Sequence, residues 1–166
     1  MSRKIPVSSM AQTAVVAAIY AALTVLLAPF SYGAVQVRIS EALMLLCMFR
    51  KRWCVALTIG CMIANLFSGM AADFLFGTAA TLLAALLMYR IKKPVIAALI
   101  PAVTNGLLVG AELFLFLDVP FLLGAAGVAA GEIISVAVIG LPLMRRARQS
   151  KLLCRLIGAP YSEPRE

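Results

Sequence analysis

The side chains that could do chemistry in this sequence are a few ionisable and amide groups inside long apolar stretches. Arg38 and Glu41 stand three residues apart, so on a helix they would share one face. A charge at membrane depth is costly unless it is paired or hydrated, so such a residue marks a functional site by default. The further candidates lie in later apolar stretches and are Asn65, Asn105, Glu112 and Glu132.

These six side chains favour the binding of a ligand. The three glutamates outnumber the one cation, Arg38, so at least one carboxyl group must be protonated, hydrated or free to meet a ligand. A carboxylate accepts two parallel N–H bonds, and an amide group both donates and accepts. The set therefore suits a flat, polar small molecule that is rich in N–H donors.

Structural explanations stay open for several of these residues. Arg38 and Glu41 could form only an ion pair within their helix, and Asn105 could only hydrogen-bond a neighbouring helix. Asp73 begins a predicted helix, so we interpret it as an N-cap in preference to a ligand contact. Asp118 is interpreted as a solvated loop residue.

The residue types exclude several classes of site. Histidine is absent and the four cysteines show no Cys-x-x-Cys spacing, so we expect no zinc or redox site and interpret the cysteines as apolar fillers. No G-x-x-x-x-G-K-[ST] loop is present, so the chain cannot bind ATP in the Walker manner. We therefore expect no metal, no cofactor and no catalytic residue, and the protein is predicted not to be an enzyme.

Composition indicates a membrane protein. Of the 166 residues, 63% are hydrophobic and 13% are charged, and the mean hydropathy is +1.01. A soluble domain would need more polar residues to cover its surface. We predict an all-α protein with a single membrane domain, 1–166, so any energy source would lie on another chain. The first apolar run lacks a convincing cleavage site and is interpreted as a retained helix rather than a signal peptide.

Six apolar runs are each near the roughly 20 residues that cross a bilayer as a helix. Their predicted bounds are about 9–29, 34–49, 53–68, 73–89, 94–117 and 121–144, followed by a basic tail at 145–166. Lys and Arg cluster before the first run and after the second, fourth and sixth. By the positive-inside rule, this pattern predicts six transmembrane helices with both termini in the cytoplasm. The basic tail would lie near anionic membrane lipid, so the net charge of +8 does not indicate nucleic-acid binding.

Most of the candidate polar residues fall in the outer halves of the predicted helices. With a rise of about 1.5 Å per residue, Arg38, Glu41 and Glu112 would lie within about 10 Å of the outer surface. Glu132 would lie near the middle of its helix, and the inner halves are nearly all apolar. A proton or ion pathway would need polar steps through both halves. We predict instead a pocket that opens to the outside and is closed towards the cytoplasm.

Small residues line one face of the first predicted helix. Ala14, Ala18 and Ala22 recur every four residues. In lipid, small residues at this spacing let two helices approach closely, so the face is predicted to be a packing surface. The spacing leaves open whether it packs inside its own bundle or against a partner protein.

Four short motifs in the apolar stretches are distinctive. They are Val35–Ala42 (VQVRISEA), Ala64–Gly69 (ANLFSG), Gly77–Thr81 (GTAAT), and Asn105-Gly106 followed by Glu112. These motifs resemble the QueT family of queuosine-precursor transporters, which are of the energy-coupling-factor (ECF) type. The resemblance runs from about Ala14 to Met144.

The resemblance implies the six-helix fold of an ECF S component, the substrate-binding subunit of this type of ABC importer. It implies that the face with Ala14, Ala18 and Ala22 docks onto a transmembrane coupling subunit (EcfT), driven by two cytoplasmic ATPases (EcfA and EcfA'). Release is then expected when the S component topples in the membrane. The location would be the bacterial cytoplasmic membrane, with several spans.

The resemblance also implies a 7-deazaguanine ligand, such as the aminomethyl precursor, the cyano precursor or queuine. We expect Glu112 or Glu132 to hold the edge of the base, and Arg38 to hold the carboxylates in place. The residues around the base would be Glu41, Asn65 and Asn105. An aminomethyl group adds a cation, for which a surplus carboxylate is the natural partner.

Two other functions are weighed against this one. A self-standing small transporter or channel would need a polar path through the inner half, which the sequence does not show. An intramembrane enzyme acting on lipid would need a metal-binding acidic motif or a Ser/His-type pair, and the sequence offers neither.

Overall fold

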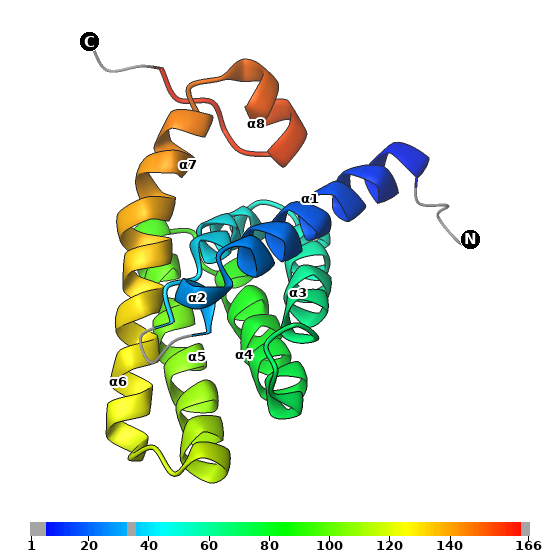
Figure 1. Ribbon diagram of the computed structural model, residues 1–166. Helices are drawn as coiled ribbons and strands as arrows, with labels where there is room; N and C mark the ends of the chain where they lie inside the picture. Colours follow the sequence, from blue (N-terminus) through cyan, green and yellow to red (C-terminus); the bar gives the residue numbers. More distant parts are fainter. Residues whose placement is uncertain (1–5, 33–35, 164–166) are drawn as a thin grey trace.

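The computed structural model of the chain describes residues 6–32 and 36–163. Within these residues the protein is all-helical, as predicted, and contains no strand (Figure 1). The elements, in chain order, are α1 (Val7–Leu26), α2 (Ala28–Ser31), η1 (Ile39–Met48), α3 (Lys51–Asn65), α4 (Ala71–Arg90), α5 (Pro94–Leu117), α6 (Phe121–Glu132), η2 (Ile133–Gly140), α7 (Leu141–Ala147) and α8 (Lys151–Ile157).

Within residues 6–32 and 36–163, four segments are long and apolar enough to cross a membrane. They are α1, α4, α5 and the continuous rod Phe121–Ala147, which comprises α6, η2 and α7. The prediction of a multi-span helical membrane protein is therefore supported for four of the six expected spans. The six-span count and the cytoplasmic placement of both termini stay predictions.

The predicted helix at 34–49 is wrong in its start and its type. Residues 34–35 lie outside the described residues, Arg38 has extended backbone angles (φ −92°, ψ 97°), and η1 begins only at Ile39. The extended backbone is tied to α2, because the Val37 amide donates to the Phe30 carbonyl at 3.0 Å. η1 is a 3-10 helix, which rises about 2 Å per residue, so its ten residues extend only about 20 Å.

The other predicted bounds differ by smaller amounts. α5 has the predicted bounds, whereas α3 ends at Asn65 rather than at residue 68. The last rod continues to Ala147, so the first residues of the predicted tail belong to a helix. η2 within this rod is a π-helix, and it ends two residues before Pro142 of α7. A proline inside a helix has no N–H to donate and its ring clashes with the preceding turn, which explains a wider turn here.

The helices pack closely where glycine faces a neighbouring backbone. A Cβ on Gly110 of α5 would lie 2.8 Å from the Ala125 Cα of α6, and one on Gly60 of α3 would lie 2.7 Å from the Ala17 carbonyl oxygen of α1. Only glycine allows such an approach. These contacts fix α5 against α6 and α1 against α3.

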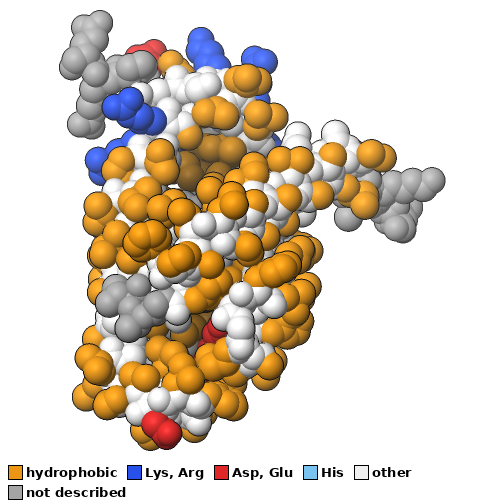
Figure 2. Space-filling view, in the orientation of Figure 1, with side chains coloured by type: hydrophobic (Ala, Val, Ile, Leu, Met, Phe, Trp, Pro, Cys, Tyr) orange, Lys and Arg blue, Asp and Glu red, His pale blue; other side chains and the backbone are white. Residues whose placement is uncertain are grey.

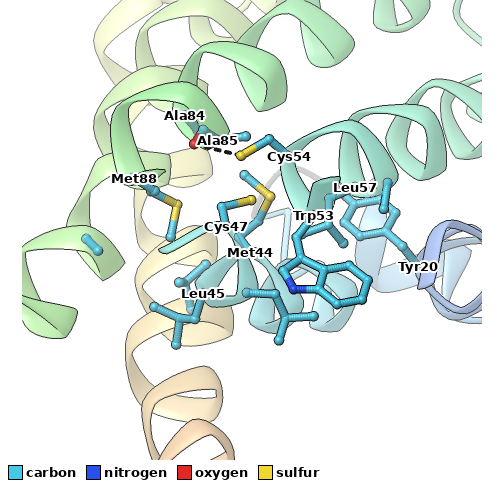
Figure 3. Packing of buried hydrophobic residues seen from close by; sticks show 14 of the residues in the cluster. Tyr20, Met44, Leu45, Cys47, Trp53, Cys54, Leu57, Ala84, Ala85 and Met88 are labelled. Carbon is cyan, nitrogen blue, oxygen red and sulfur yellow. Dashed lines mark hydrogen bonds between the residues drawn. The ribbon is translucent and has the colours of Figure 1, made fainter. Parts of the chain in front are cut away.

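An apolar core lies between η1, α3 and α4. Tyr20, Met44, Leu57 and Met88 are completely buried in it, and Cys54 Sγ donates to the Ala85 carbonyl at 3.4 Å (Figure 3). All four cysteines are free and buried, which fits their interpretation as fillers. The outer surface of the bundle is also largely apolar, as Figure 2 shows for one face. A surface of this kind suits contact with lipid.

The alanine face of α1 is exposed. Ala14, Ala18 and Ala22 lie on the outer side of the helix, whereas Ala17 and Ala21 are buried. α1 runs obliquely across the bundle, and its first turns project beyond the other helices (Figure 1). Packing inside the bundle therefore does not account for the predicted stripe, and its outer side is available to a partner or to lipid.

Candidate functional site

All six predicted site residues are buried, although they come from four different helical segments and the extended residue before η1. Buried polar atoms in proteins nearly always have hydrogen-bond partners. Here many do not. Among the described residues, the buried atoms without a partner include Arg38 Nη2, Glu41 Oε2, Asn65 Oδ1, Asn105 Oδ1, both Glu112 carboxylate oxygens and Glu132 Oε2.

The first acid is held by α1. The Tyr20 hydroxyl donates to Glu41 Oε1, and both side chains are completely buried. One turn later in α1, Thr24 Oγ1 lies 2.6 Å from Ser40 Oγ and also donates to the Tyr20 carbonyl at 2.9 Å. α1 therefore orients Glu41 through one oxygen and leaves Oε2 free for another donor.

Arg38 is held differently from what the sequence predicts. Its Nε donates to the Ser31 carbonyl at 3.1 Å, and its guanidinium lies 5.2 Å from the centre of the Tyr32 ring. Within the described chain it forms no ion pair with Glu41, and Nη2 has no partner. The interpretation of Arg38 and Glu41 as an ion pair within a helix is therefore wrong, because the extended backbone turns Arg38 towards α2. Arg38 also does not clamp the carboxylates through direct bonds.

Asn65 connects the end of α3 to the start of α4. Its Nδ2 donates to the Asp73 carbonyl at 2.9 Å, and its Oδ1 has no partner among the described residues. A Cβ on Gly77 would lie 2.7 Å from this Nδ2, so glycine makes room for the amide group. Asn65 thus has a structural role, and its Oδ1 remains an acceptor without a partner in the described chain.

Asp73 lies closer to the candidate site than its interpretation as an N-cap predicts. The N-cap of α4 is Met70, and Asp73 lies in the first turn, so its interpretation as an N-cap is wrong. Its side chain is only 5% exposed and lies beside the carboxyl group of Glu112 on α5. Two adjacent buried carboxyl groups are unfavourable unless a donor lies nearby. The sequence held one signal for this contact: Asp73 stands at the predicted outer end of its helix, at a membrane depth similar to that of Glu112.

Asn105 and Glu132 join α5 to the rod that follows. Asn105 Nδ2 donates to Glu132 Oε1 at 2.5 Å, so the expected bond between helices is present. Asn105 Oδ1 and Glu132 Oε2 have no partner in the part of the chain that the structure describes. A Cβ on Gly131 would lie 2.2 Å from the Gln36 carbonyl oxygen, so the extended segment before η1 lies directly against this rod.

These contacts bring the three glutamates into one neighbourhood. Each of Glu41, Glu112 and Glu132 lies within electrostatic range of Arg38, and Glu41 is also within range of Glu132. By these interactions we group the acids as a first pair, Glu41 and Glu132, and a second pair, Glu112 and Asp73.

A cavity of about 450 Å³ lies beside these groups, between the segments that connect the helices. Its polar lining comes from Tyr32, Gln36, Ser68 and Asp73, and its apolar lining from the end of α5 and the start of α6. None of the six predicted residues lines the cavity itself. Two residues of the cavity lining lie next to the predicted residues. Asp73 is adjacent to Glu112, and Gln36 packs against Gly131, the residue before Glu132. The volume suits a small molecule.

The fold and the site together define a class. A bundle of apolar helices encloses acids and amides with unpartnered atoms next to a cavity, which is the arrangement of a membrane protein that takes up a small polar solute. The chain matches the family model described as QueT transporter over residues 10–149, and it belongs to that family. The family is one of transporters rather than enzymes.

A relative from Lactococcus lactis subsp. cremoris (strain MG1363), named Queuosine precursor transporter QueT, is 42% identical over 86 residues. The aligned part covers 48% of this chain and 51% of the relative, so the chain spans about half the length of the relative that it matches. No solved structure matches the chain at a significant level.

Proposed function

We propose that this protein is the substrate-binding S component of an ECF-type importer and that it captures a queuosine precursor, a 7-deazaguanine. The observation that carries the proposal is the surplus of buried acceptor atoms without partners beside a cavity of suitable size. The family membership and the name of the relative support the same ligand class.

The edge of a 7-deazaguanine complements the first pair of acids. The base presents several N–H donors and one carbonyl acceptor. Glu41 Oε2 and Glu132 Oε2 are acceptors whose sister oxygens are already fixed by Tyr20 and Asn105. Arg38 Nη2 is a buried donor without a partner among the described residues, and it would suit the carbonyl. A carboxylate positioned in advance loses less entropy on binding.

The second pair of acids suits a cationic substituent. Asp73 and Glu112 are adjacent and buried, both Glu112 oxygens are without a hydrogen-bond partner in the described chain, and Asp73 lines the cavity. The aminomethyl precursor carries an ammonium group, which would neutralise this pair. We therefore propose that the aminomethyl form is preferred over the cyano form.

The exposed face of α1 supports a docking role. Ala14, Ala18 and Ala22 offer a smooth helix surface outside the bundle, which another transmembrane helix could approach closely. We propose that a coupling subunit of the EcfT type binds here in the bacterial cytoplasmic membrane and that two ATPases of the EcfA type supply the energy. Co-purification from native membranes tests this assembly, and Ala18→Trp should remove both partners without loss of precursor binding.

The ligand proposal is tested by binding of radiolabelled aminomethyl precursor to the full-length chain in detergent, without ATP. Glu132→Gln should weaken binding about 10- to 100-fold, because a charge-assisted hydrogen bond in a buried site is lost. Asp118→Asn is the matched control, since Asp118 is an exposed acid with left-handed backbone angles that asparagine tolerates. Unchanged affinity in Glu132→Gln and in Glu112→Gln would exclude this site.

A further inference from the structure

A second pocket lies at the other end of the molecule, where the tail folds back onto the start of α3. Its volume is about 450 Å³, and its lining includes Arg50, Lys151, Arg155, Gly158 and Tyr161. The lining contains three cations and no acid. Figure 2 shows Lys and Arg side chains gathered at this end of the molecule.

Specific bonds hold the tail in place. Trp53 Nε1 donates to the Ile157 carbonyl at 2.8 Å, and Arg52 Nη2 donates to the Leu156 carbonyl at 2.9 Å. Both acceptors are at the end of α8, where free carbonyls attract donors. Gly158 follows with φ 82°, and a Cβ there would lie 2.1 Å from Arg50 Nε. The pocket is therefore a defined structure rather than a loose basic surface.

The three cations of the pocket keep most of their donors free. Arg50 forms one long bond, from Nη2 to the Arg155 carbonyl at 3.5 Å. Lys151 Nζ lies 5.6 Å from the centre of the Tyr161 ring. Neither the Lys151 nor the Arg155 side chain is hydrogen-bonded within the part of the chain that the structure describes. Three cations in one pocket, with no acid among its described lining residues, suit a phosphate group.

Apolar side chains of the same helix point to a membrane lipid as the source of the phosphate. Leu152, Leu153 and Leu156 of α8 are 68%, 41% and 41% exposed. A short helix with exposed leucines beside a basic cluster is typical of a segment that lies in the interface of an anionic membrane. A free phosphate ion would give these leucines no partner.

We infer that the pocket formed by Arg50, Lys151 and Arg155 binds the phosphate headgroup of an anionic membrane lipid, with the α8 leucines in the acyl region. This site is separate from the acid-rich site and requires none of its residues. It would fix the tail end of the protein at the membrane surface.

The test uses Trp53, which is the only tryptophan of the chain and is bonded to the tail. The full-length protein in detergent is titrated with short-chain phosphatidylglycerol, short-chain phosphatidylcholine or inorganic phosphate, and Trp53 fluorescence is recorded. We expect a saturable change with phosphatidylglycerol only. Lys151→Gln/Arg155→Gln should weaken the response about 10- to 30-fold. The matched control, Lys92→Gln/Lys93→Gln, removes two cations from another basic segment and should change it less than about twofold.

Each contrary outcome overturns the inference in a different way. No response of the unaltered protein to phosphatidylglycerol would exclude the site. An equal loss in both double variants would show diffuse attraction of charge rather than a pocket. Competition by inorganic phosphate at the same affinity would assign the pocket to the free ion. Precursor binding should be unchanged in both double variants, so failure here leaves the proposed function standing.

Discussion

The acids around Arg38 and the cations near the tail differ in how far the protein itself supplies their hydrogen-bond partners. Around Arg38, buried acids present acceptors that have no donors within the described chain. At the tail, side-chain donors of Arg52 and Trp53 in α3 meet backbone carbonyls of α8. The second arrangement stabilises the fold. The first costs stability unless the acids are protonated or hydrated, or a ligand supplies the missing donors.

The largest effect is expected when a substitution places a cation beside the buried acids. Asn105→Lys would place an ammonium group beside Glu132, where Asn105 Nδ2 now donates. Precursor binding should fall about 100-fold or more, because the carboxylate is occupied. The midpoint of thermal unfolding, Tm, should not fall, because a surplus acid gains a partner. Both quantities are measured on the purified chain.

Asn105→Leu is the matched variant, because it has a similar volume and no donor. It should lower Tm by about 2 to 4 °C, since Glu132 loses its one partner. If Asn105→Lys lowered Tm more than Asn105→Leu does, the acids would not be short of positive charge, and the contrast between the two regions would be wrong.

A smaller effect separates the two pairs of acids. Asp73→Asn removes one charge from the pair that faces the cavity, so binding of the aminomethyl precursor should weaken about tenfold. Binding of the cyano precursor, which has no ammonium group, should change less than about twofold. Competition of each compound against one radiolabelled ligand gives both values. Equal losses for the two compounds would assign Asp73 to the shared part of the base.

The smallest expected effect comes from the helix that supports the site. Tyr20→Phe removes the hydroxyl that orients Glu41 and keeps the ring in the core. Affinity should fall about three- to fivefold, from the loss of one hydrogen bond. Tyr89→Phe at the exposed end of α4 is the control. A loss as large as that of Glu132→Gln would mean that Tyr20 itself contacts the ligand.

Helices and their burial were predictable because their signals are local. α5 is a long apolar run with Pro94 in its first turn, and it ends where Asp118 adopts φ 54°. The burial of the acids was predictable because few polar groups interrupt such runs. Each of these inferences needs only the identity and spacing of neighbouring residues.

The partners of the site residues depend on how distant helices are rotated, which one sequence does not contain. The contact of Asp73 with Glu112 requires a particular rotation of α4 against α5. The extended backbone at Arg38 is set by bonds to Phe30 and Ser31, so its periodicity misled the prediction of a helix. The π-helix before Pro142 changes which residues share a face of the helix. The apolar residues of this run are too continuous to reveal that change.

The two sides of α1 suggest how a bound solute would be released. Its inner side carries the hydroxyl that holds Glu41, and its outer side carries the bare alanines, with less than one turn between Ala18 and Tyr20. Since the helix is rigid over that distance, a protein that grips the outer side and tilts α1 also displaces Tyr20. If the proposed coupling subunit binds this face, its pull on α1 would lower the affinity for the bound solute without any contact between the two.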